Sequence, residues 1–167
     1  MDFKLEPWRP ALAQSLAAAA NDQDIAAYLR DAFPHPYTPA DAEAFIAQCV
    51  QSGDASGLFR AITLGDEAVG SISVIPGSDV YRRSAELGYF LAKPWWGQGL
   101  MTWAVQRITA EAFSRYDICR IYAEPFAHNF GSRRVLEKTG FALEGTLYRS
   151  VCKNGQMYDS CIYALTR

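Results

Sequence analysis

The sequence has no long apolar run, few histidines and no closely spaced cysteine pair. No apolar stretch reaches the about 18 residues of a membrane-spanning helix, and residues 1–6 lack the basic-then-apolar layout of a signal peptide. The four cysteines are irregularly spaced without a Cys-x-x-Cys motif, so we expect buried free thiols in a reducing compartment. These absences predict a cytoplasmic protein that has no membrane partner.

Metal and nucleic-acid sites also lack their usual residues. Only His35 and His128 are available to a His/Cys zinc site, so we expect no metal. The 16 Lys and Arg residues against 18 Asp and Glu give a formal charge of −2, and nonspecific nucleic-acid binding needs cationic side chains to neutralise phosphates. We therefore expect no nucleic-acid partner, and a cationic or neutral substrate.

The composition, with 50% hydrophobic and 20% charged residues among 167, predicts one globular domain over residues 1–167. The most informative stretch is 84–101, which reads S-A-E-L-G-Y-F-L-A-K-P-W-W-G-Q-G-L-M. Its first half alternates with period two, as a strand does, until Pro94. Gly97-Gln98-Gly99 then precedes apolar residues at helical spacing, which predicts a turn from strand to helix.

A helix that begins after glycines is a candidate anion site. Its first amides have no partner within the helix, its dipole is positive there, and glycine lets a phosphate approach the backbone. The motif is neither a dinucleotide G-x-G-x-x-G, because Thr102 fills the third place, nor a triphosphate loop, because no G-K-[ST] follows. A tight turn without a ligand remains the alternative.

The rest of the chain predicts a mixed α+β layer fold in which two helices cross over a sheet. Pro34 to Tyr37 should be extended, and Thr38-Pro39 is typical of a helix start. The expected strands are 3–5, 58–64, 68–75, 85–92, 118–124, 141–152 and 157–165, and the expected helices are 12–20, 25–32, 39–51, 100–115 and 129–139. Asn154-Gly155 predicts a tight hairpin between the last two strands.

Two parts of the sequence resemble a known family. The E-L-G-Y-F of 86–90, followed by W-G-Q-G-L-M at 96–101, resembles the acetyl-CoA site of the GNAT acetyltransferases, in particular their RimJ/RimL-like branch. H-N-F-G-S at 128–132 and L-E-K-T-G-F at 136–141 are similar to the second half of that family. The resemblance implies a GNAT fold: a mixed, mostly antiparallel sheet with helices on both faces, and two strands that splay around the pantetheine arm.

The resemblance also implies acetyl-CoA as co-substrate and a set of residues around it. In the family, the asparagine matching Asn129 binds pantetheine and the serine matching Ser132 lies near the thiol. A helix cap at Asn129 and a polar first-turn residue at Ser132 are the structural alternatives. The implied cofactor-binding residues are Phe90, Leu91, Ala92, Gly97, Gln98, Gly99, Leu100, Met101, Asn129 and Ser132.

Acetyl transfer to an amine needs a base for the amine proton and donors for the thioester oxygen. Glu86 is our first candidate for the base, because partial desolvation at that place favours a base active near neutral pH. Glu124 at the end of the next strand is the second, and a purely structural Glu86, solvated or paired with Arg82 or Arg83, is the alternative. We expect backbone amides near Leu91 to polarise the thioester.

Two positions depart from the family pattern. Pro94 stands where the family has Gln or Arg, so a side-chain contact from that place is missing. Leu136 stands where many relatives have the tyrosine that protonates the thiolate, so Ser132 or water would serve, or the thiolate would leave unprotonated. These departures keep a second hypothesis open, a catalytically silent acyl-CoA sensor.

The acceptor is not decided by the sequence. The family resemblance favours the N-terminal amine of a protein, and a small amine of the aminoglycoside or polyamine type is the alternative. Trp95 and Trp96 are either core residues or a wall of the acceptor tunnel. Aromatic residues around the terminal hairpin leave a homodimer open.

Overall fold

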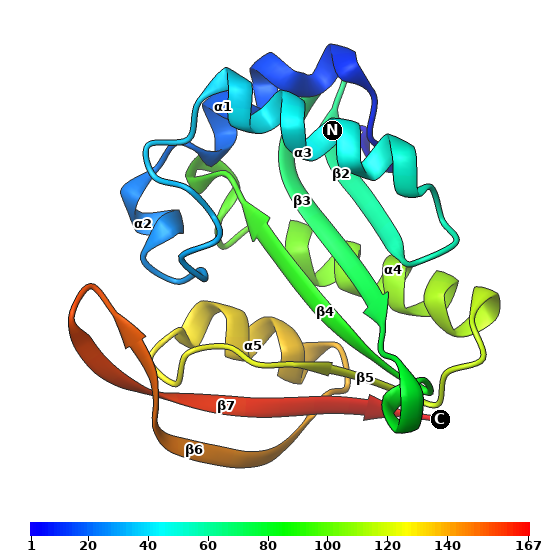
Figure 1. The fold of residues 1–167 in the computed structure, drawn as a ribbon, viewed down its shortest axis with the longest axis vertical. Coiled ribbons are helices and arrows are strands. Elements are labelled where there is room, and N and C mark those ends of the chain that lie inside the picture. Colours follow the sequence, from blue (N-terminus) through cyan, green and yellow to red (C-terminus); the bar gives the residue numbers. More distant parts are fainter. The chain divides into compact units, whose positions relative to one another are not determined.

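The computed structural model describes residues 1–167 as an α+β fold on a seven-stranded mixed sheet (Figure 1), as predicted. The strand order is β1-β2-β3-β4-β5-β7-β6; β4 and β5 run parallel, whereas β1 with β2, β5 with β7 and β6 with β7 run antiparallel. The strands are β1 (Phe3–Pro7), β2 (Leu58–Leu64), β3 (Glu67–Pro76), β4 (Ser84–Leu91), β5 (Arg120–Ala123), β6 (Ala142–Lys153) and β7 (Gln156–Thr166). The helices are α1 (Ala13–Ala20), α2 (Gln23–Ala26), α3 (Pro39–Ser52), α4 (Leu100–Arg115) and α5 (Phe130–Lys138), with 3₁₀ turns η1 (Pro10–Leu12), η2 (Asp79–Tyr81) and η3 (Lys93–Trp95).

The chain divides into two compact units. Unit 1 comprises Met1–Ser73 and Gly88–Leu100, and unit 2 comprises Val74–Leu87 and Met101–Arg167. The strands β3 and β4 are therefore divided between the two units, and α4 has its first residue, Leu100, in unit 1 and its other residues in unit 2. None of the helices combines the length and apolar composition that crossing a bilayer requires.

In unit 1, α1 and α3 lie side by side (Figure 1) and pack against each other. The alanine-rich sequence of α1 allows this close packing, because alanine presents little side-chain volume. Trp8 and Phe45 meet edge to face with ring centroids 5.4 Å apart, which is a favourable aromatic geometry. The buried cluster there also contains Leu12, Leu16, Ala20, Ala42, Ile46, Cys49, Ala61 and Ala68.

The start of α3 is fixed by a capping box. The Thr38 hydroxyl oxygen accepts the amide of Asp41 at 3.2 Å, and the Asp41 carboxylate accepts the amide of Thr38 at 2.8 Å. Pro39 occupies the first helical position, where its missing N–H is no loss. The prediction of a helix that starts at Pro39 is confirmed, and the helix ends at Ser52.

The predicted second helix over 25–32 is wrong in extent. The observed α2 is the single turn Gln23–Ala26, capped by Asp22, whose carboxylate accepts the amide of Asp24 at 2.7 Å. Beyond it, the amides of Tyr28 and Leu29 donate to carbonyls three residues back, which closes tight turns and stops the α-helix. The segment predicted as extended contains bends, and the His35–Pro36 peptide bond is cis.

The turn of the terminal hairpin is confirmed at Asn154-Gly155. These residues have φ angles of 52° and 76°, and positive φ at both central positions is what the tight two-residue turn requires. The hairpin joins β6 and β7, whose pairing extends from Lys153↔Gln156 to Ala142↔Ala164.

In unit 2, α5 is fixed to β7 through one buried tyrosine. The Tyr163 side chain is fully buried; its hydroxyl donates to Glu137 at 2.9 Å and accepts from Arg133 at 3.0 Å. Burial raises the pKa of Tyr163, which keeps the phenol neutral. The face of the sheet that carries Tyr163 is therefore the face that α5 covers.

The expectation of four buried thiols is wrong for two of the cysteines. All four are free, and Cys49 and Cys161 are buried, but Cys119 is half-buried and Cys152 is exposed. Cys152 lies near the end of β6, the last strand in the order, and strand alternation at an edge leaves side chains open to solvent.

Candidate functional site

The glycine turn before α4 has the geometry that the sequence predicts. Gly97 and Gly99 have φ angles of 72° and 79°, a region that favours glycine, and the 16-residue helix α4 begins at the next residue, Leu100. The space that a Cβ would fill at either glycine is open, so backbone conformation and not crowding requires glycine here. The Gln98 side-chain amide donates to the carbonyl of Pro94 at 2.8 Å and closes the turn.

This turn suits an anion. The first amides of a helix lack intrahelical partners and carry the positive end of its dipole, and a phosphate needs open backbone beside it. The open space at Gly97 and Gly99 meets that need. The residues present therefore fit the pyrophosphate of acetyl-CoA.

The end of β4 is held by backbone and side-chain bonds within unit 1. The amide of Ala92 donates to the carbonyl of Val69 at 2.8 Å, and the Trp96 indole N–H donates to the carbonyl of Leu91 at 2.7 Å. Gly70 of β3 is required by close approach, because a Cβ there would lie 2.6 Å from the carbonyl oxygen of Phe90. No local pattern in the sequence points to Gly70, since its requirement comes from a residue twenty positions away.

The two tryptophans have different surroundings. Trp95 packs edge to face on Phe3 with centroids 5.3 Å apart, whereas Trp96 is 41% exposed and acts through its N–H. Packing is thus confirmed for Trp95. A role for Trp96 in the acceptor tunnel stays a prediction.

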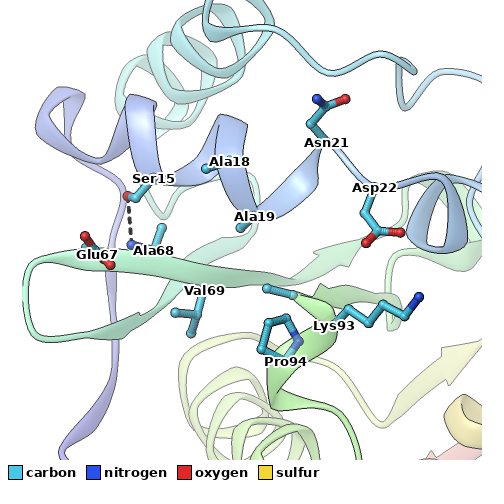
Figure 2. Close-up of a pocket in the computed structure, with 11 residues that line it drawn as sticks. Ser15, Ala18, Ala19, Asn21, Asp22, Glu67, Ala68, Val69, Lys93 and Pro94 are labelled. Atoms are coloured by element: carbon cyan, nitrogen blue, oxygen red, sulfur yellow. Dashed lines mark hydrogen bonds between the residues drawn. The ribbon is translucent and has the colours of Figure 1, made fainter.

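A groove of about 310 Å³ opens in unit 1 beside this segment (Figure 2). The Ser15 hydroxyl accepts the amide of Ala68 at 2.9 Å along its wall. Lys93 is paired with Asp24, and this hydrogen bond raises the pKa of the lysine. Among the predicted cofactor residues only Ala92 lines this groove, whose other lining residues are Ser15, Ala18, Ala19, Asn21, Asp22, Glu67, Ala68, Val69, Lys93 and Pro94.

In unit 2, Glu86 stands at the end of a short parallel ladder. The pairs between β4 and β5 run from Ser84↔Arg120 to Glu86↔Tyr122, so Glu86 is in the last pair. Tyr122 in turn pairs with Ala164 of β7, and paired residues share a face of the sheet. Glu86 is half-buried and lies on the face of the sheet opposite α5.

Asn129 and Ser132 meet at the start of α5. The Asn129 side-chain oxygen accepts the amide of Ser132 at 3.2 Å, so Asn129 is the helix cap. This cap uses the amide oxygen and leaves the Nδ2 hydrogens to another acceptor. Both residues are half-buried, and contact of either one with pantetheine stays a prediction.

Glu124 has a hydrogen-bond partner that is distant in the sequence. The fully buried Ser160 of β7 donates its hydroxyl to the Glu124 carboxylate at 2.9 Å. The two residues are 36 positions apart, and no motif links them. Glu124 itself is exposed, and its role as a base stays a prediction.

The two departures from the family pattern have structural counterparts. Leu136 is fully buried, so position 136 belongs to the core and offers no group that could protonate a thiolate. Pro94 lies in η3, and its carbonyl accepts the Gln98 side chain. No three metal-ligating side chains converge in the structure.

Comparisons with known proteins are consistent across sequence and structure. Residues 2–142 match the family model described as an acetyltransferase (GNAT) domain. Probable N-acetyltransferase YjcK of Bacillus subtilis (strain 168) is 37% identical over 109 residues, which make up 65% of this chain and 59% of YjcK. The match thus spans about three-fifths of that relative.

Solved structures share the fold over nearly the whole chain. The microcin self-immunity acetyltransferase MccE, in complex with acetyl-CoA and AMP, has a TM-score of 0.83 at 25% identity and covers 99% of this chain and 93% of its own. RimL, a ribosomal alpha-N-protein acetyltransferase in complex with coenzyme A, has a TM-score of 0.86 at 19% identity, with 98% and 93% covered.

Proposed function

Because the chain belongs to the GNAT acetyltransferase family, we propose that it is an acetyl-CoA-dependent N-acetyltransferase that transfers the acetyl group directly to a primary amine. The observation that carries this proposal is the open glycine turn at 97–99, which leads directly into α4. We propose residues 1–167 as one acetyltransferase domain. A cytoplasmic location and a homodimer remain predictions.

Acetyl-CoA supplies an activated thioester, and the chain supplies binding and proton transfer. The amides of the Gly97–Met101 segment hold the pyrophosphate, and backbone donors near Leu91 face the thioester oxygen as it gains charge. Glu86 accepts the proton of the attacking amine as the C–N bond forms and the C–S bond breaks. Ser132 or water returns a proton to the thiolate, because Leu136 offers none.

We propose the N-terminal amine of a protein as the first candidate acceptor. The structural likeness to RimL supports this choice only at the level of the fold. The likeness to MccE, whose structure contains AMP, keeps a small-molecule acceptor as the second candidate. Both kinds of amine are cationic at neutral pH, in agreement with a formal charge of −2 on this chain.

The test is release of CoA thiol from acetyl-CoA, measured with N-terminal peptides, polyamines and aminoglycosides. We expect Glu86→Gln to lower kcat by about 100-fold or more, since loss of a general base costs that much. Glu111→Gln is the matched control, because that carboxylate pairs with Arg115 within α4. Equal turnover of wild type and Glu86→Gln would remove Glu86 as the base.

Cofactor binding is tested separately at the glycine turn. Gly99→Ala and Gly53→Ala both force alanine to a positive φ, at 79° and 55°, and in both the added Cβ meets no other atom. Both variants should lose about 1 kcal/mol of stability or more, whereas only Gly99→Ala should weaken acetyl-CoA binding in calorimetry. Binding without turnover of any amine would instead favour the silent acyl-CoA sensor.

A further inference from the structure

Three polar groups in unit 2 form a continuous chain of hydrogen bonds. The Ser160 hydroxyl oxygen lies 2.9 Å from a carboxylate oxygen of Glu124 and 2.7 Å from the hydroxyl oxygen of Ser150. The Ser150 hydroxyl also lies 3.0 Å from the carbonyl oxygen of Leu147. Ser160 is fully buried, whereas Glu124 and Ser150 are exposed, so one buried hydroxyl connects two groups that reach solvent.

A bulge in β6 makes this chain of hydrogen bonds possible. The pairing of β6 with β7 jumps from Leu147↔Ser160 to Val151↔Tyr158, so three residues of β6 stand opposite one residue of β7. Within the bulge, Arg149 has a φ of 53°, and its amide donates to the Asp159 carboxylate at 2.7 Å. In the register on the turn side of the bulge, which includes Val151↔Tyr158, Ser150 would pair with Asp159, and the bulge brings it beside Ser160 instead. The bulge directs the Ser150 hydroxyl to Ser160.

The hydrogen-bond chain offers the Glu124 carboxylate a partner in both of its protonation states. When Glu124 is ionised, Ser150 donates to Ser160 and Ser160 donates to Glu124. When Glu124 is protonated, the direction reverses: Glu124 donates to Ser160, Ser160 to Ser150, and Ser150 to the carbonyl of Leu147. Each hydroxyl has one hydrogen to donate and lone pairs to accept, so the carboxylate and both hydroxyls keep a partner in either state, while the Leu147 carbonyl receives the Ser150 hydrogen only when Glu124 is protonated.

The strand register places the hydrogen-bond chain on the same face of the sheet as Glu86. Glu86 pairs with Tyr122, and Tyr122 pairs with Ala164. Ser160 is four positions from Ala164 on β7, and alternate residues of a strand share a face. Ser160 therefore points to the Glu86 side, away from α5.

The proposed reaction must remove two protons from its acceptor. A primary amine is mainly an ammonium ion at neutral pH, with a pKa of about 8 for an N-terminus and about 10 for an alkyl amine. The ammonium must lose one proton before nitrogen can attack, and the attacking nitrogen loses a second as the amide forms. The second proton ends on the CoA thiol, so the net reaction releases one proton to solvent.

We propose that Glu124 takes the first of these protons and that Ser160 and Ser150 pass it to solvent. This inference rests on the proposed acetyltransferase function and assigns the second proton to Glu86. The ammonium N–H bond breaks and a proton binds Glu124. Glu124 then donates to Ser160, Ser160 to Ser150, and Ser150 to water, so each hydroxyl gains one proton and loses one. The relay matters when the bound acceptor covers Glu124 and direct exchange with water is blocked.

Ser160 is thus a positioning residue that also carries the proton, and Ser150 is the residue that releases the proton to water. The neighbouring elements carry several ionisable groups near this position, among them Glu86 of β4, Tyr122 of β5, His128 before α5, Arg149 of β6, and Tyr158 and Asp159 of β7. His128 stacks on Tyr158 with centroids 4.5 Å apart, and Asp159 is bound to the amide of Arg149.

The test is the pH dependence of kcat/KM with a peptide that begins with alanine. Without the relay, only the acceptor molecules that are already neutral can react. This fraction is about one in ten at pH 7 for an α-amine. Glu124→Gln should therefore lose about tenfold in kcat/KM at pH 7 and approach wild type by about pH 9. Ser150→Ala should change the profile in the same direction, and Ser150→Thr, which keeps a hydroxyl, should restore it.

Ser150 is the decisive position because it is exposed, so Ser150→Ala should fold normally, whereas Ser160→Ala removes a buried partner. Ser114→Ala, at an exposed serine of α4, is the matched control and should match wild type at every pH. An equal loss at all pH values in Glu124→Gln would indicate a structural role and overturn the relay. So would a Ser150→Ala profile identical to that of wild type. No turnover by the wild-type protein would instead overturn the proposed function itself.

Discussion

Trp96 donates its indole N–H to the carbonyl oxygen of Leu91 over 2.7 Å, and this bond ties the glycine turn to the end of β4. The neighbouring Trp95 packs on Phe3, so one of the two tryptophans contributes a ring contact and the other a hydrogen bond. The bond spans five positions and encloses η3. The geometry of the proposed pyrophosphate site thus depends on a side chain outside the glycine motif.

We predict that Trp96→Phe weakens acetyl-CoA binding about fivefold. Phenylalanine keeps an aromatic ring but cannot donate to Leu91, and a hydrogen bond contributes about 1 kcal/mol. Calorimetry would measure the dissociation constant, with Trp95→Phe as the control that changes packing and leaves this bond in place. Unchanged affinity in Trp96→Phe would show that the turn holds its shape without the bond.

A second prediction concerns the stability of unit 1. Arg60 is buried and forms two hydrogen bonds of 2.8 Å with Asp54, whose side chain is 33% exposed. Asp54→Asn removes the charge that compensates the guanidinium, and we expect a loss of about 2 kcal/mol in the free energy of unfolding. This is less than the about 3–5 kcal/mol for a fully buried pair, because solvent reaches Asp54.

Urea unfolding followed by circular dichroism would measure this loss. Asp66→Asn is the matched control, because Asp66 is fully exposed and lies 3.5 Å from Arg9, so its loss should change stability very little. Equal stability of the two variants would mean that Arg60 does not need its partner.

The cysteines give a third prediction. Burial raises the pKa of the Cys49 thiol to about 11, so almost none of it is thiolate at pH 8, whereas Cys152 is exposed. Iodoacetamide at pH 8 should modify Cys152 in the folded protein and leave Cys49 unmodified until denaturant is added. Mass spectrometry of the peptides would show the order, and early modification of Cys49 would contradict the buried position.

Elements with clear local signals were predicted well. The capping pair Thr38-Pro39 set the start of α3, and Gly99 set the start of α4, whose end at Arg115 also matches. The failure at α2 shows the limit of such signals. Its leucine and alanine content favours a helix over 25–32, but a short helix depends on packing and not on propensity, and the chain turns after Ala26.

The candidate site also combines features with a local sequence signal and features that depend on tertiary contacts. The glycine turn is local, so the sequence alone predicted its position between strand and helix, and the structure adds the positive φ angles. The link between Glu124 and Ser160 depends on strand pairing and on a bulge in β6, which no spacing in the sequence reveals. The same holds for Gly70, where glycine is required because the carbonyl of Phe90 lies too close for a side chain.

The last prediction concerns alkaline pH. The Tyr37 side chain is buried, and burial, with smaller contributions from Asp41 and Cys49, raises its pKa from 10.0 to about 12. The folded state therefore holds the phenol proton more tightly than the unfolded state does. This contribution to stability is complete below about pH 10 and is lost as the pH rises toward 12.

Thermal unfolding between pH 9 and 12 tests this assignment. The Tm of wild type should fall more steeply from pH 10 to 12 than that of Tyr37→Phe, which has no phenol to ionise. Lysine deprotonation affects both proteins and cancels in the comparison. Tyr148→Phe is the control, because Tyr148 is 80% exposed, and its curve should run parallel to that of wild type. If the Tyr37→Phe curve ran parallel to wild type as well, ionisation of Tyr37 would not limit stability, and the alkaline loss would belong to other groups.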